Sequence, residues 1–369
     1  MPDVFTERAH NSFGGNIINS IKGVLFGAIL FIASFFVLYW NEGRLDYSQY
    51  AQKAIQLGPA VEQSAQGKLI SATGAVVSSE SVGDEYLRPG KYLAVKRVAE
   101  MYAWKQQTKS KTKNNTGGSS DTETTYSYAK EWNEHPWPSK SFKYPDGHEN
   151  PTMPFGGAEN KVKTAALGSY DLSFDQIQTR AEDFAPLVLA PEQVILSNQI
   201  KLENSSYLFF GKGAMAEPQV GDLRVSYQTL APGREYTVFG KLTGQKIEPY
   251  LVEKNNSWFY PLIAGTRDAA VKKLSDNYTS ALWIWRGVGF AMMWVGLMLL
   301  LGPLGALANF FPMLGALTKN MVFFITLPVA LALSGAAILV AMVFHNLLVL
   351  LALLAVAVVA GVVILRRKK

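Results

Sequence analysis

The sequence contains no cysteine and few charged residues. Without thiols, the chain has no disulfides, thiolate metal sites, cysteine nucleophiles or cysteine-linked lipids. Only 17% of its 369 residues are charged, whereas soluble domains usually have about a quarter. Because 49% of the residues are hydrophobic while the mean hydropathy is only +0.08, the composition indicates one membrane-embedded part and one water-soluble part.

Motifs for catalysis and for nucleic-acid binding are also lacking. The Gly-Lys pairs at Lys91, Lys212 and Lys241 are not followed by the Ser or Thr that a phosphate-binding loop needs. The sequence has neither the GxSxG elbow nor an HExxH motif. The net charge is +6. The basic residues of the chain are scattered rather than arranged in a stripe with aromatic residues. We therefore expect no enzymatic activity, no cofactor and no nucleic-acid partner.

Uncharged segments predict where the chain meets a membrane. Residues 23–41 carry no charge and end in the aromatic pair Tyr39 and Trp40, which predicts a first transmembrane helix. A signal peptide would be shorter and would end in small residues at a cleavage site. The segment 283–301 predicts a second transmembrane helix, and the Gly- and Pro-containing segment 302–319 predicts an interfacial connection.

The remaining apolar sequence is long enough for two more helices. His345 and Asn346 form its one strongly polar pair, so we expect transmembrane helices at 320–344 and 347–365. Pro328 should kink the first of these helices or mark its first turn.

The basic tail, residues 366–369, sets the expected orientation. Positive residues beside a membrane helix favour the cytoplasmic side. With four crossings, both termini are cytoplasmic, residues 1–22 form a short cytoplasmic N-terminus, and residues 44–280 lie in the periplasm or a lumen. A fifth crossing within 302–319 would reverse the side of this large segment.

Residues 44–280 have the pattern of a β-rich domain. Apolar and polar residues alternate in GDLRVSY at Gly221–Tyr227, and turn sequences separate other strand-like stretches. We expect a mobile hairpin tip at Gln106–Thr125 and helices at Ser173–Arg180 and Arg267–Tyr278. The predicted fold class is an α+β membrane protein with four transmembrane helices, the β-rich domain being inserted between the first and the second.

Candidate ligand-binding residues are few. His135 and His148, with nearby acidic residues, are weak metal candidates, but the surrounding prolines and lysines favour an exposed loop without metal. Asp222 and Arg224 lie two residues apart on one strand face, where they could bind a charged head group or form an ordinary ion pair.

Small residues in the predicted helices could allow close helix contact. Gly289, Gly296 and Gly335 are the candidates. They could join copies of the protein or only pack the helices of one chain.

Several short motifs resemble the LUMA family (the transmembrane protein 43 family), of which we expect this chain to be a bacterial member. They are NEGR (Asn41, Glu42, Gly43 and Arg44), EMYxW (Glu100, Met101, Tyr102 and Trp104), YSYxxEW (Tyr126, Tyr128, Glu131 and Trp132) and GDLRVS (Gly221, Asp222 and Arg224). The resemblance implies a scaffold that self-associates and organises membrane protein complexes, with structural rather than catalytic motif residues.

The same resemblance implies a membrane location and partners. The expected location is the bacterial inner membrane for a prokaryotic chain, and the endoplasmic reticulum and inner nuclear membrane for a eukaryotic one. We expect copies of itself, other membrane proteins and lipids as partners. The alternatives are an enzyme acting on lipid or envelope material and a conduit for solutes or lipids; the lack of charge inside the predicted helices disfavours the conduit.

Overall fold

The computed structural model describes residues 3–58, 63–115, 119–197, 200–303 and 315–345. The chain forms two compact units. The first, called the β-domain, consists of Met1–Phe5, Asp46–Lys109 and Thr125–Ser275. The second, called the helical unit, consists of Thr6–Leu45, Ser110–Thr124 and Asp276–Lys369.

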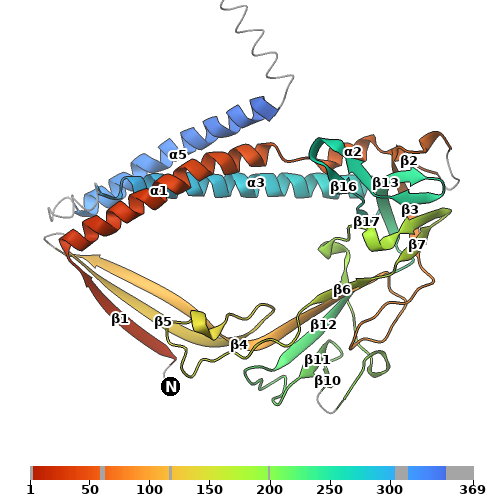
Figure 1. The fold of residues 1–369 in the computed structure, drawn as a ribbon, viewed down its shortest axis with the longest axis horizontal. Helices are drawn as coiled ribbons and strands as arrows, with labels where there is room; N and C mark the ends of the chain where they lie inside the picture. Colours follow the sequence, from red (N-terminus) through yellow and green to blue (C-terminus); the bar gives the residue numbers. More distant parts are fainter. Residues whose placement is uncertain (1–2, 59–62, 116–118, 198–199, 304–314, 346–369) are drawn as a thin grey trace, which may run out of the picture. The chain divides into compact units, whose positions relative to one another are not determined.

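The larger sheet of the described residues has eight strands. Its order is β1-β5-β4-β12-β11-β10, with β6 pairing to β4 and β9 to β12 (Figure 1). Because only residues 115–119 connect β4 and β5, these two neighbours form an antiparallel hairpin, as the sequence predicted. The strands are β1 (Val4–Asn11), β4 (Ala94–Asn114), β5 (Ser120–Asn133), β6 (Ala158–Lys161), β9 (Ala185–Pro186), β10 (Ile200–Glu203), β11 (Tyr207–Phe210) and β12 (Leu223–Leu230).

A second sheet completes the β-domain. Its order is β17-β13-β14-β8-β7-β3-β2, and β13 also pairs with β3. The strands are β2 (Ile55–Gln56), β3 (Leu69–Val77), β7 (Thr164–Leu167), β8 (Tyr170–Ser173), β13 (Glu235–Thr243), β14 (Lys246–Glu248) and β17 (Leu262–Ala264). The strands β15 (Tyr250–Val252) and β16 (Ser257–Phe259) form a separate pair, and α2 (Tyr47–Lys53) precedes β2.

The core of the β-domain follows from the alternation of its strands. On β12, Leu223, Val225 and Tyr227 are buried while Arg224 and Ser226 are partly exposed, so the predicted half-buried strand is confirmed. Val225 and Tyr227 join one apolar cluster with residues from both sheets, and Leu223 joins a smaller one with Met101. Each large side chain that leaves water contributes about 1.5–3 kcal/mol.

The helical unit contains long apolar helices that lie side by side (Figure 1). They are α1 (Phe13–Glu42), α3 (Arg267–Leu300), whose first turns belong to the β-domain, and α5 (Gly315–His345). Ser12 caps α1 by accepting a hydrogen bond from the Gly15 amide. Leu38, Met293 and Ala330, one from each helix, form a fully buried cluster.

Within the described residues, three helices are long and apolar enough to cross a membrane. They match the first three predicted segments to within about two residues, whereas the predicted fourth helix at 347–365 lies outside the described residues. The large β-rich part and the apolar helices confirm an α+β membrane protein, but a fourth crossing stays a prediction. Pro328 lies inside α5 rather than in its first turn.

Local differences from the sequence interpretation have clear causes. The chain forms strand β1 at Val4–Asn11 and starts α1 at Phe13, within the segment 1–22 interpreted as a short N-terminus. The expected helix at Ser173–Arg180 is only a single turn at Phe174–Gln176, because Ile177 adopts an extended conformation. Most of the expected mobile tip is strand, since Ser110 and Thr124 pair through their hydroxyls, 3.0 Å apart.

Candidate interaction site on the motif-bearing sheet

The motif residues of three strands meet around Arg224. On β12, Arg224 donates two hydrogen bonds, of 2.6 and 2.9 Å, to the carboxylate of Glu100 on β4, directly opposite in the ladder. Its guanidinium also lies over the rings of Trp132 and Tyr207, 4.9 and 5.1 Å from their centroids. Tyr102 packs against Trp132 at 5.3 Å. Sequence alone paired Arg224 with Asp222 as one alternative, but the cross-strand register gives it Glu100.

A neighbouring group of motif residues is held by Asn150. The Asn150 side chain accepts from the Trp104 amide at 2.7 Å and donates to the Trp104 carbonyl at 2.8 Å. Lys105 donates to Glu131 at 2.9 Å, and the Lys130 ammonium lies over the Trp104 ring at 4.5 Å. The motif residues of β4 and β5 are therefore joined by polar and cation–π contacts, each worth about 0.5–1 kcal/mol at partly exposed positions.

Asp222 does not pair with Arg224, because it is buried and stabilises a loop through hydrogen bonds to backbone amides. Its carboxylate accepts from the backbone amides of Lys212, Gly213 and Gln219 at 2.7–3.2 Å. A side chain at Gly211, with φ +152°, would collide with this carboxylate. Gly221 also has a positive φ, +98°. Asp222 therefore fixes the turn before β12 and is not open to a head group.

His148 lies in an aromatic cluster of the β-domain. It is 1% exposed and stacks on Tyr128 with ring centroids 3.9 Å apart, while the Trp104 ring meets it edge-on at 4.8 Å. Its Nδ1 donates to the Tyr144 carbonyl at 3.1 Å, and its Nε2 lies 3.5 Å from the Asp3 carboxylate. The imidazole therefore packs as one ring of this cluster and is not open to a metal.

The other members of these motifs are placed as follows. His135 is exposed, and its backbone amide donates to Asn133. No cluster of three or more His, Asp or Glu side chains suited to a metal occurs among the described residues. Tyr126 packs edge-on against Tyr144, and Met101 is buried beside Leu223.

A buried network that the sequence did not reveal stabilises the same sheet. Asp84 pairs with Arg97 at 3.0 Å and accepts from the Tyr227 hydroxyl at 2.8 Å. Burial, with the neighbouring Asp84 charge, raises the pKa of Tyr227 far above its ordinary value. Asp84 lies more than 100 positions from Tyr227, and no local pattern links the two.

Two open clefts lie on the β-domain. One, of about 420 Å³, adjoins the motif residues and is lined by Pro136, Trp137, Pro138, Ser139, Lys140, Asn150, Pro151, Thr152 and Met153. The other, of about 560 Å³, is lined by Gln176, Gln178, Lys241, Glu248, Pro249 and Trp258. The indoles of Trp137 and Trp258, each 58% exposed, give both clefts apolar surface.

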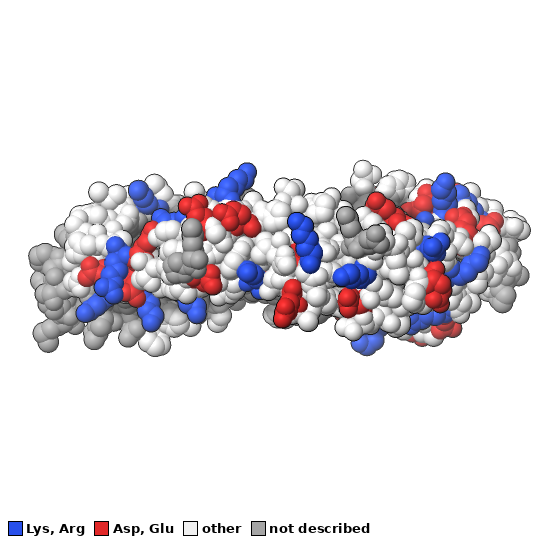
Figure 2. Space-filling view, turned by 90° about the horizontal axis from the view of Figure 1, so that it is seen from below, with Lys and Arg blue, Asp and Glu red and all other residues white. Residues whose placement is uncertain are grey.

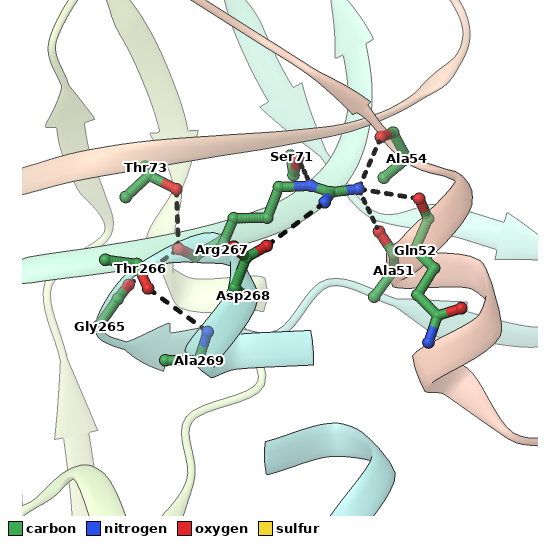
Figure 3. Close-up of polar contacts among 11 residues, drawn as sticks. Ala51, Gln52, Ala54, Ser71, Thr73, Gly265, Thr266, Arg267, Asp268 and Ala269 are labelled. Carbon is green, nitrogen blue, oxygen red and sulfur yellow. Dashed lines mark hydrogen bonds and ion pairs between the residues drawn. The ribbon is translucent and has the colours of Figure 1, made fainter. Parts of the chain in front are cut away.

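The start of α3 is joined to the end of α2 by Arg267 (Figure 3). Its Nη2 donates to the carbonyls of Ala51, Gln52 and Ala54 at 2.8–3.3 Å, and its Nε donates to Ser71 at 3.1 Å. Carbonyls at a helix C-terminus lack partners within the helix and carry partial negative charge, which a guanidinium satisfies. The expected helix at Arg267–Tyr278 is thus the first part of an unbroken α3.

The NEGR motif lies at the C-terminal end of α1 and bonds to α3. Glu42 receives two hydrogen bonds of 2.8 Å from Arg286, and Asn41 donates to the Leu282 carbonyl at 3.0 Å. The Arg44 guanidinium lies 5.7 Å from the Trp40 ring centroid. A side chain at Gly43 would collide with the His345 ring. Asn41 and Glu42 thereby join α1 to α3, and Gly43 leaves room for the last residue of α5.

The three candidate contact glycines fall into two groups. A Cβ at Gly296 would lie 2.8 Å from the Phe31 amide, and one at Gly289 would lie 2.5 Å from Leu38, so both glycines allow α1 and α3 to approach closely. Among the described atoms, nothing lies within 4 Å of a Cβ at Gly335. Gly335 thus does not pack against α1 or α3 in the described part of the chain.

This combination of long apolar helices and a β-domain with internally paired motif residues defines a membrane protein of the α+β class. The family model for transmembrane protein 43 matches residues 101–347, and the chain belongs to this family.

Curated relatives agree with this assignment. The chain is 26% identical over 291 residues to the transmembrane protein 43 homolog of Drosophila melanogaster, covering 74% of each chain. It is 26% identical to transmembrane protein 43 of Rattus norvegicus over 330 residues and of Homo sapiens over 331 residues, in both cases covering 84% of this chain and 78% of the relative. No solved structure matches the chain significantly.

Proposed function

We propose that the protein is a membrane-anchored scaffold without enzymatic activity. It self-associates through its apolar helices, and its β-domain binds other membrane proteins and lipid head groups. The observation that carries the proposal is the exposed apolar surface of the helices, where Leu25, Phe36 and Phe324 are 65%, 70% and 70% exposed. Surface of this kind needs lipid or another helix as its partner.

Self-association is supported most directly by the open position at Gly335. The exposed neighbours Leu331 and Leu339, 63% and 65% exposed, lie one helical turn before and after it. A small residue between two large apolar ones lets a second helix approach closely, and it gains van der Waals contact along the groove. Gly289 and Gly296 do not offer this surface, because α1 and α3 use them inside one chain.

The proposed location follows from the sequence. The basic tail at 366–369 is cytoplasmic, and the β-domain lies on the opposite side, in the periplasm of a bacterium or in the lumen of the endoplasmic reticulum or nuclear envelope. On the face that Figure 2 draws, Lys and Arg are interleaved with Asp and Glu. Such mixed charge suits protein partners better than nucleic acid.

The test is the native mass of the protein in mild detergent, with co-purifying proteins and lipids identified. We expect a defined oligomer for the wild type and a smaller species for Gly335→Leu. Gly287→Leu is the matched control, because Gly287 is equally open in the described structure but lies on α3. A monomeric wild type without bound partners, or an unchanged mass for Gly335→Leu, would contradict self-association through this face.

A further inference from the structure

The larger of the two clefts on the β-domain is lined by one indole and by polar side chains. Its volume is about 560 Å³, within the range of about 300–1,000 Å³ that small-molecule sites occupy. The residues that line it are Gln176, Gln178, Lys241, Glu248, Pro249 and Trp258. All six belong to the β-domain, so the cleft lies within one compact unit.

The Trp258 indole is the open apolar surface of this cleft. It is 58% exposed, and no aromatic or cationic side chain of the described residues stacks on it. The next residue on β16, Phe259, is only 2% exposed, as the alternation of a strand requires. Trp258 therefore lies on the face of β16 that is turned away from the core.

The backbone that carries Trp258 is held in place by Gln178. The Gln178 side-chain nitrogen donates to the Trp258 carbonyl at 3.0 Å, and its oxygen accepts from the Tyr260 amide at 3.3 Å. The buried Tyr260 hydroxyl donates in turn to the Ile247 carbonyl on β14 at 2.5 Å. Because these bonds fix the backbone on both sides of the cleft, little ordering of the protein remains for a ligand to bring about.

The polar groups of the cleft are available to a ligand. Lys241 on β13 lies directly opposite Glu248 on β14, where opposite charges usually pair. The Glu248 carboxylate, 33% exposed, lies 3.7 Å from Lys246 instead. Within the described residues, the side chains of Lys241 and Gln176 make no hydrogen bond or ion pair. The cleft thus offers an ammonium and an amide as donors and a carboxylate as acceptor beside the indole.

This set of groups matches the chemistry of a sugar ring. A pyranose has an apolar C–H face that packs on an indole, and a rim of hydroxyls that each donate and accept hydrogen bonds. An ammonium and an amide donate to such hydroxyls, and a carboxylate accepts from them. One positive and one negative side chain line the cleft, so it favours a neutral ligand over a strongly charged one.

We propose that this cleft binds a neutral carbohydrate. One pyranose ring stacks on Trp258, and its hydroxyls bond to Lys241 and Glu248, with Gln176 as a further donor. The ring belongs to a free oligosaccharide or to the head group of a glycolipid, which present the same face. Glycosidases use two carboxylates, and Glu248 is the only one among the six lining residues, so the cleft fits binding better than cleavage.

Such a site extends the binding role proposed for the β-domain and does not depend on self-association. The cleft is complete within one β-domain, so a monomer would bind the sugar as well as an oligomer does. Failure of the sugar to bind would leave the native mass of the protein unchanged, and the two proposals are therefore tested separately.

The first experiment measures the binding of maltose, lactose, mannobiose and diacetylchitobiose. The full-length protein is purified in a detergent that has no sugar head group, and saturation-transfer NMR detects each disaccharide. We expect at least one of them to bind with a Kd of about 1 mM or below. Failure of all four to bind at concentrations up to about 10 mM would overturn the proposal.

Two equally exposed tryptophans provide the matched comparison. Trp258→Ala should weaken binding by about tenfold or more, because an indole that packs on a ligand is a dominant contact. Trp137→Ala is the control, since Trp137 is also 58% exposed but lines the other cleft, and it should leave the Kd unchanged. Trp258→Phe keeps an aromatic face and should lose less than Trp258→Ala. An unchanged Kd for Trp258→Ala, or equal losses for Trp258→Ala and Trp137→Ala, would overturn the proposal.

A second position keeps the test decisive if Trp258→Ala fails to fold. The Gln176 side chain is exposed and makes no hydrogen bond within the described residues, so Gln176→Ala should not alter the fold. It should weaken binding by about threefold to tenfold, the effect of one lost hydrogen bond. An unchanged Kd for Gln176→Ala would contradict the proposed contacts.

The last experiment distinguishes the two sources of the sugar. Mixed micelles carry a diacylglycerol glycosylated with the disaccharide that binds, and micelles with the unglycosylated diacylglycerol are the control. Displacement of the disaccharide by the glycosylated lipid alone supports a glycolipid head group as the ligand, and no displacement by either lipid supports a free oligosaccharide. Equal displacement by both lipids would mean that the cleft recognises lipid rather than sugar and would overturn the proposal.

Discussion

Removing the Arg224 guanidinium should destabilise the β-domain by about 3 kcal/mol. Two charge-assisted hydrogen bonds to Glu100 contribute about 1.5–3 kcal/mol together, and contacts with Trp132 and Tyr207 add about 0.5–1 kcal/mol each. The Arg224 and Glu100 side chains are 24% and 20% exposed, so solvent screening keeps the total near the lower end of that sum. For a domain of about 150–250 residues, 3 kcal/mol lowers Tm by about 6–12 °C.

The assay is thermal and urea unfolding of the detergent-purified protein, followed by tryptophan fluorescence. Trp132 lies under the guanidinium, so its emission reports directly on the site. Arg224→Lys keeps the charge but loses the two-pronged geometry, and it should cost about half as much. A double-mutant cycle with Glu100→Gln should give a coupling energy of at least about 1 kcal/mol. Additive effects, or a loss below about 0.5 kcal/mol for Arg224→Ala, would refute a structural role for the pair.

Three further predictions concern helix packing, the helix junction and pH. Gly296→Leu should dissociate α1 from α3, because its Cβ would lie 2.8 Å from the Phe31 amide. Protease resistance of the helices in detergent measures this dissociation. The control Gly287→Leu should leave the protease resistance unchanged. Arg267→Ala should lower stability by about 2 kcal/mol, since it removes the donor that three carbonyls at the end of α2 share. Urea unfolding of Arg267→Ala beside Arg267→Lys checks this. Hydrogen bonds from Thr164 and Lys163 hold the pKa of Glu80 below its usual value. The ionised Glu80 carboxylate therefore stabilises the folded protein fully above the ordinary Glu pKa of about 4.3, and this stabilisation is lost as the pH falls through the lowered pKa. Unfolding midpoints of wild type and Glu80→Gln should therefore differ at neutral pH and converge in acid, and a constant difference would contradict this linkage.

The elements that sequence predicted well are those that depend on local pattern. Uncharged apolar segments located the helices α1, α3 and α5, and alternation located β12. The early start of α3 was divided into two elements, because Arg267–Tyr278 is polar and only the structure shows an unbroken helix through it. Helix boundaries in polar sequence depend on tertiary contacts such as those of Arg267.

The candidate site depended on pairing between distant segments, which sequence spacing does not encode. Arg224 and Asp222 are near in sequence, yet the β4–β12 register joins Arg224 to Glu100 and the turn geometry directs Asp222 to backbone amides. His148 looked like an exposed loop residue, because its neighbours in sequence are polar. Its burial comes from Tyr128 on β5 and Trp104 on β4. Motif order carried more information than the chemistry of single residues.

The attachment of α3 at Arg267 has a mechanical consequence. α3 is one continuous helix to Leu300, so force along its axis reaches the first turn without a break. There the guanidinium of Arg267 donates hydrogen bonds to a carbonyl at the end of α2 and to the Ser71 hydroxyl on β3. Strand β3 pairs with β13 along seven residues. The first turn of α3 is therefore anchored to the sheet by side-chain hydrogen bonds as well as by the backbone.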